Sequence, residues 1–195
     1  MSKKVEAAPT ETTQQIAVLV FEKPEPSVWA ESAEDRAKAA YRELEDLAKK
    51  DEVQIESATI VFRTEEGRAK LRRTSDWTAG KGAGRGAFWG LMVGLILGGP
   101  VAGLLAGSGL GALLGGRKAK GIDRNFMKKL SERMKPGNAA LFMLVRADDD
   151  TTISQLEAYD APLYTTPLTN DVEEAVKKAT ERQEVLEAIK FDKLD

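Results

Sequence analysis

One glycine-rich segment constrains this chain more than any other part of its sequence. Of its 17 glycines, 14 lie between Gly80 and Gly116, and no charged residue occurs between Arg85 and Arg117. Two series of glycines, each with a step of four residues, meet at Gly98-Gly99-Pro100; their members are Gly82, Gly86, Gly90, Gly94 and Gly98, and then Gly99, Gly103, Gly107, Gly111 and Gly115. Because 3.6 residues complete a helical turn, each series forms a stripe without side chains against which another helix can pack closely. The sequence therefore predicts a glycine-zipper hairpin of two helices, with these ten glycines as its helix-packing residues.

Such a hairpin is not expected to be stable alone in water. A glycine inside a helix costs about 0.8 to 1 kcal/mol relative to alanine, so ten cost on the order of 8 to 10 kcal/mol, comparable to the stability of a whole domain. The leucine-rich faces beside the glycines also need a cover. Three interpretations remain open at this point: insertion into a membrane, which we favour, burial in a soluble homo-oligomer, and a flexible loop.

The residues that flank the segment support the membrane interpretation. Basic side chains stand on both sides of it, as the positive-inside rule requires of a hairpin whose two ends stay in the cytoplasm. Trp77 and Trp89 suit the aromatic belt of a bilayer. Each half is shorter than the roughly 20 apolar residues of a full span, which favours a re-entrant or thin hairpin. The expected membrane-interface residues are Trp77, Lys81, Arg85, Trp89, Arg117, Lys118 and Lys120.

The rest of the chain predicts an α+β domain. Apolar runs and alternation indicate strands at 16–21, 53–62, 69–71 and 139–145, and a possible edge strand at 163–166 that Pro167 ends; helical spacing indicates helices at 33–50, 122–134, 151–159 and 170–190. The order β-α-β-β-α-β is the split βαβ, or ferredoxin-like, pattern. We expect a flexible arm (1–15), two halves of the ferredoxin-like domain (16–75 and 121–168), the glycine-zipper hairpin between them (76–120), and an added C-terminal helix and tail (169–195) that offers a possible surface for a protein partner.

Composition and motifs argue against catalysis. The 195 residues include no His and no Cys, so the chain lacks the commonest general base, the thiolate nucleophile and the best metal ligands. Gly82-x-Gly84-x-x-Ala87 matches a loose dinucleotide fingerprint, but the acidic residue expected about 20 positions later is missing. The acidic run at 148–150 is interpreted as a helix cap instead of a cation site. We expect no enzyme activity, catalytic residue, cofactor or metal, and a net charge of −2 with no aromatic platform predicts no nucleic-acid partner.

Several stretches resemble one bacterial family. Thr78-Ala79-Gly80, Gly86–Leu91, Gly121-Ile122-Asp123 and Pro136–Phe142 are similar to the domain of unknown function 1269. The resemblance implies a ferredoxin-like domain interrupted by a glycine-zipper hairpin, in a family usually described as uncharacterised membrane proteins, and it brings no activity. We therefore expect a non-enzymatic protein at the cytoplasmic face of the inner membrane that contacts lipid, associates with itself, and uses its α/β domain for sensing or assembly. A soluble cytoplasmic homo-oligomer with the hairpin buried inside, acting as a scaffold or a small-ligand sensor, is the alternative.

Overall fold

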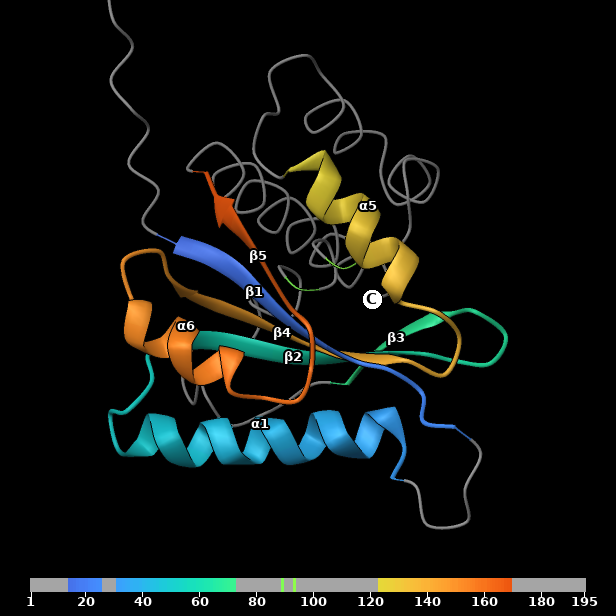
Figure 1. The fold of residues 1–195 in the computed structure, drawn as a ribbon, viewed down its shortest axis with the longest axis horizontal. Helices are drawn as coiled ribbons and strands as arrows, with labels where there is room; N and C mark the ends of the chain where they lie inside the picture. Colours follow the sequence, from blue (N-terminus) through green and yellow to red (C-terminus); the bar gives the residue numbers. More distant parts are fainter. Residues whose placement is uncertain (1–13, 26–30, 73–88, 90–92, 94–122, 170–195) are drawn as a thin grey trace, which may run out of the picture.

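The computed structural model describes residues 14–25, 31–72, 89, 93 and 123–169. Within them the chain forms an α+β fold with a five-stranded antiparallel sheet and three helices, which we call the α/β domain (Figure 1). The elements in chain order are β1 Gln14–Phe21, α1 Ala33–Lys49, β2 Ile55–Arg63, β3 Ala69–Arg72, α5 Arg124–Arg133, β4 Ala139–Arg146, α6 Asp150–Glu157 and β5 Leu163–Leu168. Their types and order confirm the sequence prediction for this part of the chain. The predicted helix at 170–190 lies outside the described residues, as does the hairpin apart from positions 89 and 93.

The strands are ordered β3-β2-β4-β1-β5 across the sheet. Strand β4 therefore lies between β1 and β2, and β1 lies between β4 and β5, with every neighbouring pair antiparallel. Helix α1 connects β1 to β2 across β4, and α6 connects β4 to β5 across β1, so two βαβ units interleave in one sheet. The sequence interpretation instead assigned α5, the helix that precedes β4, to the second βαβ unit. That assignment was wrong because helical spacing shows where a helix lies and not which strands it connects.

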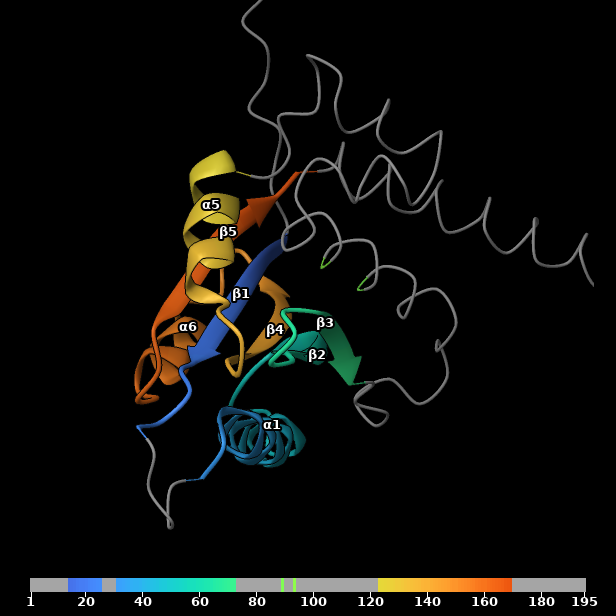
Figure 2. The ribbon, with the colours of Figure 1, turned by 90° about the vertical axis from the view of Figure 1, so that its right-hand side faces the viewer.

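The sheet has an apolar core on each of its two faces. In β1, Ile16, Val18 and Val20 point to one face, and Ala17, Leu19 and Phe21 point to the other. This alternation follows from the pleat of a strand, and a continuous apolar run results because both faces are covered. Helices α1 and α6 cover one face, and α5 covers the opposite face, so the α/β domain has three layers (Figures 1 and 2).

The two edge strands carry features that discourage pairing with other chains. All four residues of β3 are exposed, and two of them are the basic residues Lys70 and Arg72. Strand β5 continues through Pro167 to Leu168, which corrects the expectation that Pro167 ends it. A proline is tolerated there because an edge strand needs ladder hydrogen bonds on one side only. Charge on one edge and proline on the other are common means of preventing edge-to-edge aggregation.

Candidate functional site

The predicted hairpin segment contributes two side chains to the core of the α/β domain. Trp89 and Val93 are both helical, are one turn apart, and are 4% and 1% exposed. They pack on the sheet face that α5 covers. The indole Nε1–H of Trp89 donates to the Ser57 hydroxyl oxygen at 2.8 Å, and its ring meets the ring of Phe142 edge-on, with centroids 6.2 Å apart and planes at 70°.

This position corrects the expectation that Trp89 lies at a bilayer interface. The amphipathic character of tryptophan, which suits an aromatic belt, also suits a core position that supplies an acceptor for the indole N–H. Ser57, a buried polar residue of β2, supplies that acceptor. The other expected membrane-interface residues and all ten zipper glycines lie outside the described residues, so their roles stay predictions.

Polar contacts cap both ends of helix α5, and those at its C-terminal end connect it to the sheet. Asp123 caps the start, accepting a hydrogen bond from the backbone N–H of Asn125 at 2.6 Å. At the end, Arg63 Nη1 donates to the Met134 carbonyl and Asn138 Nδ2 donates to the Arg133 carbonyl, both at 2.7 Å. A cation near the C-terminus of a helix also complements its dipole. These contacts fix the orientation of α5 relative to the strands.

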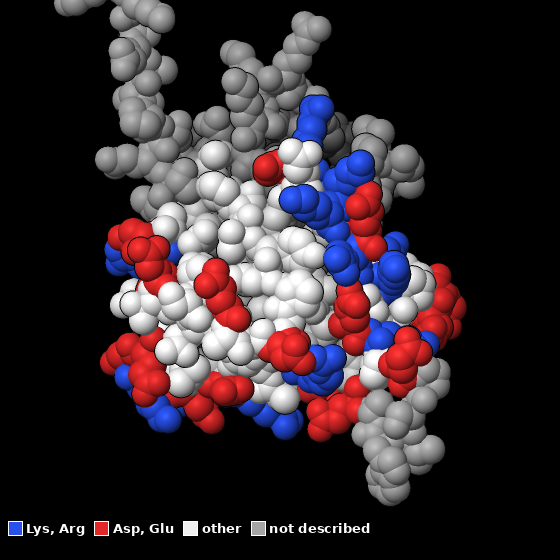
Figure 3. All heavy atoms as spheres, in the orientation of Figure 1, with Lys and Arg blue, Asp and Glu red and all other residues white. Residues whose placement is uncertain are grey.

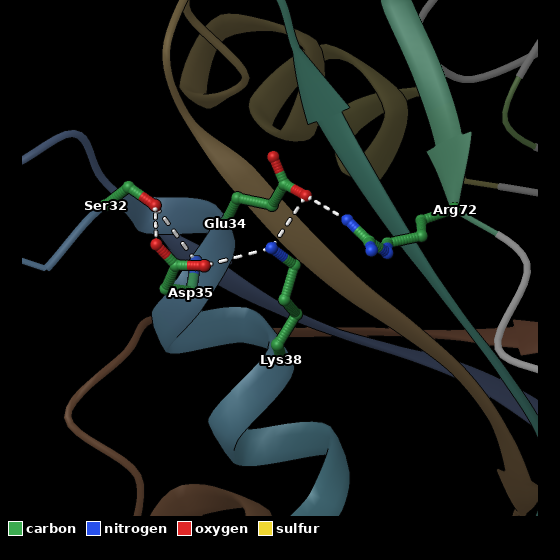
Figure 4. A network of polar contacts seen from close by, with 5 residues as sticks. All are labelled: Ser32, Glu34, Asp35, Lys38 and Arg72. Atoms are coloured by element: carbon green, nitrogen blue, oxygen red, sulfur yellow. Dashed lines mark hydrogen bonds and ion pairs between the residues drawn. The ribbon is translucent and has the colours of Figure 1, made fainter.

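A second polar network joins the end of β3, where the predicted hairpin segment follows in sequence, to the start of α1 (Figure 4). Arg72 Nη1 lies 2.7 Å from Glu34, and Lys38 Nζ lies 3.0 Å from Glu34 and 2.9 Å from Asp35. Ser32 caps α1 by accepting from the backbone N–H of Asp35. The Ser32 hydroxyl, followed by Lys38, holds the pKa of Asp35 below its usual value, and Asp35 in turn raises the pKa of Lys38. Arg72 therefore already has a protein partner, although it belongs to the basic flank of the hairpin.

The acidic run at 148–150 serves the local structure. Asp149 caps α6 by accepting from the backbone N–H of Thr152 at 2.9 Å, and Asp148 pairs with Arg146 at 2.8 Å. This confirms its interpretation as a cap. Nowhere in residues 14–25, 31–72 and 123–169 do three or more acidic side chains gather in a way that could hold a metal ion. The same part of the chain contains no helix with the length and apolar character needed to cross a bilayer.

Comparison with known families identifies the chain. A family described as "Protein of unknown function (DUF1269)" matches residues 83–181, which is half of the chain. The chain belongs to the DUF1269 family. A search of curated proteins found no match. A search of solved structures also found none.

The DUF1269 match covers only part of the sheet. It includes β4 and β5, whereas β1, β2 and β3 precede it in the chain. Strand β4 pairs with β1 and β2, and β5 pairs with β1, so the two described strands inside the match make no ladder with each other. Strands β4 and β5 therefore make their ladder hydrogen bonds with strands from the first 72 residues.

Proposed function

We propose that this DUF1269 protein is a non-enzymatic, membrane-associated protein of the cytoplasmic face. Its glycine-zipper hairpin inserts in the membrane, drives self-association, or does both, and its α/β domain is a sensing or assembly module of the ferredoxin-like class. The interleaved order of the two βαβ units supports that fold assignment. The observation that carries the functional proposal is the burial of Trp89 and Val93 on the sheet, which joins the hairpin segment to the domain by core packing.

The surface of the α/β domain supports the same division of roles. Leu71, at 39% exposure, is the one large apolar side chain exposed among the described residues. The core of the α/β domain is thus covered. The part of the chain whose apolar residues call for a partner is the predicted hairpin. Since charge on β3 and Pro167 on β5 disfavour pairing at the sheet edges, self-association is best assigned to the zipper glycines.

The position of Trp89 and Val93 limits how the hairpin can enter a bilayer. With these two residues on the sheet, 23 uncharged residues follow, from Gly94 to Gly116. Two helices that each cross a bilayer need about 40 residues. A short re-entrant hairpin, or one that packs against copies of itself in the membrane, fits this length better than two complete spans.

The direct test is extraction of membranes from cells that express the full chain. Inserted protein stays in the membrane pellet after washing with alkaline carbonate, whereas a peripheral protein is released. We expect retention, and we expect Gly94→Leu and Gly107→Leu to reduce cross-linking between copies because a leucine blocks the close approach of two helices. Complete release by carbonate would refute insertion. A monodisperse oligomer that purifies without detergent and is lost on Gly94→Leu would favour the soluble scaffold instead.

A further inference from the structure

The two sides of the sheet carry opposite charge. On one side, α1 has five acidic and four basic side chains, and α6 has two acidic and no basic ones, which gives −3 for the two helices. On the other side, α5 has four basic side chains and one acidic side chain, which gives +3. Basic side chains accordingly gather over α5 at the upper right of Figure 3, while acidic ones, mixed with basic ones, surround α1 and α6. The overall charge of −2 hides this separation.

The charges on α1 and α5 are also arranged differently along each helix. On α1, Glu34 pairs with Lys38 and Glu45 with Lys49, at 3.0 and 3.7 Å, in the favourable order one turn apart. In these pairs the exposed charges of α1 are balanced by neighbours on the same helix.

On α5, two of the pairs of side chains one turn apart carry like charges. Arg124 is followed four residues later by Lys128, and Lys129 is followed four residues later by Arg133, and like charges at this spacing destabilise a helix. Arg133 is compensated by Glu22 at 2.8 Å, and Lys128 lies 4.0 Å from Glu132. Arg124 and Lys129 are exposed and take part in no ion pair within the described part of the chain. Among the described residues, the exposed side of α5 therefore carries more basic than acidic side chains, with Glu132 as the acidic side chain of the helix.

The location of α5 suggests which anionic partner balances this excess of positive charge. The basic residues Arg117, Lys118 and Lys120 precede α5 in sequence. Trp89 and Val93 pack on the same sheet face as α5, so the described part of the hairpin segment and the cationic helix share one side of the domain. The acidic helices α1 and α6 lie on the opposite side.

We propose that the exposed face of α5, formed by Arg124, Lys128 and Lys129, docks on the surface of an anionic lipid bilayer. This inference rests on the proposed function, and it adds an orientation: the α5 side faces the headgroups and the α1 side faces away. Phe126 and Leu130 are buried in the domain, so α5 contacts headgroups through its charges and does not itself insert. A nucleic acid is the less favoured partner, because the net charge is −2 and the aromatic rings on the α5 side are buried (Trp89, Phe126 and Phe142) or half-buried (Tyr164).

Vesicle binding by the full chain tests the proposal. Neutral phosphatidylcholine vesicles are compared with vesicles that contain about one third phosphatidylserine or phosphatidylglycerol, at low and high salt. Each basic residue near an anionic surface strengthens binding about fivefold, so removal of three weakens it on the order of 100-fold. We expect this loss, confined to anionic vesicles and to low salt, for Arg124→Gln, Lys128→Gln and Lys129→Gln combined.

The matched control removes the same number of charges from the other side of the sheet. Arg42→Gln, Lys49→Gln and Lys50→Gln combined change the net charge equally, and all three residues are exposed on or beside α1. We expect this variant to bind anionic vesicles within about threefold of the parent chain, because its charges lie more than a Debye length from the surface. An equal loss for both triple variants would overturn the proposal, since it would show a response to net charge alone.

The absence of cysteine makes the orientation measurable. A polarity-sensitive fluorophore on Lys128→Cys is expected to respond to anionic vesicles, and the same fluorophore on Arg42→Cys is not. Equal responses at the two positions would refute the orientation. Binding to RNA or DNA that depends on α5, without a preference for anionic vesicles, would refute the lipid surface as the partner.

The two proposals fail separately. Retention in carbonate without any preference for anionic vesicles would leave insertion intact and refute docking through α5. An α5-dependent preference for anionic vesicles, combined with complete release by carbonate, would refute insertion and support docking.

Discussion

The contact between Trp89 and the sheet gives the sharpest prediction about this molecule. Replacing a buried tryptophan by alanine costs about 3 to 5 kcal/mol, because both the transfer free energy and the packing of a large side chain are lost. Trp89→Phe keeps an aromatic ring near Phe142 but removes the indole N–H that Ser57 accepts at 2.8 Å. A hydrogen bond of this kind contributes about 1 kcal/mol. We therefore expect Trp89→Ala to lower the free energy of unfolding by about 3 to 5 kcal/mol, and Trp89→Phe by about 1 to 2 kcal/mol.

The assay is urea unfolding of the full chain in mild detergent, followed by far-ultraviolet circular dichroism. A double-mutant cycle of Trp89→Phe with Ser57→Ala isolates their hydrogen bond, and a coupling free energy of about 1 kcal/mol is expected. Leu130→Ala, which removes a fully buried side chain of α5, serves as a reference at about 2 to 5 kcal/mol. If Trp89→Ala costs less than about 1 kcal/mol while Leu130→Ala costs the expected amount, Trp89 does not belong to the domain core and the reasoning fails.

Three further predictions concern backbone conformation, pH and topology. Gly67 and Gly137 both have positive φ, at +79° and +84°, so Gly→Ala should destabilise at either site by about 1 to 2 kcal/mol in the same urea assay. At Gly137 an added Cβ would also meet Lys23 Cδ at 2.6 Å, but that flexible side chain can move away, so the losses at the two sites should be similar. No loss at either site would contradict the positive φ. Because the pKa of Asp35 is lowered in the folded state, its contribution to stability is present above the usual carboxyl pKa and is lost as pH falls through the lowered pKa. Ser32→Ala should raise this pKa in an NMR titration and should weaken the dependence of the free energy of unfolding on pH in the acid range. An unchanged pKa would contradict the role of Ser32. A fragment of residues 83–195 should give no dispersed NMR spectrum, because its two described strands have no ladder with each other; a folded fragment would refute the strand order.

Local patterns carried enough information to place the described strands and helices. The run Ala139–Arg146 is apolar at almost every position, and it becomes the strand between β1 and β2 that is buried on both faces. Helical spacing predicted a helix at 33–50, and α1 spans Ala33–Lys49 with Ser32 as its cap. Both signals depend on neighbours within a few residues, and this is why they could be recognised in the sequence.

Contacts between distant residues could not be predicted in the same way. Helices α5 and α6 both precede a strand, and nothing in their spacing shows that α6 crosses over within the sheet while α5 covers its other face. The partner of Trp89 is 32 residues away at Ser57, on another element. Asn138, which joins the backbone N–H of Lys23 to the Arg133 carbonyl, gave no signal beyond its place before a buried strand. These features depend on which faces meet, and periodicity within one element does not contain that information.

The burial of Trp89 and Val93 also decides how the hairpin should be studied. Removing both side chains from the core costs about 3 to 5 kcal/mol for the tryptophan and about 1.5 to 3 kcal/mol for the valine. That sum is of the same order as the 5 to 15 kcal/mol stability of a typical domain. Deletion of the whole hairpin segment would therefore also destabilise the α/β domain strongly, so a loss of membrane association in that variant could not be assigned to the glycines. Substitutions from Gly94 onward leave both core side chains in place, so an effect on membrane retention or self-association can then be assigned to the zipper itself.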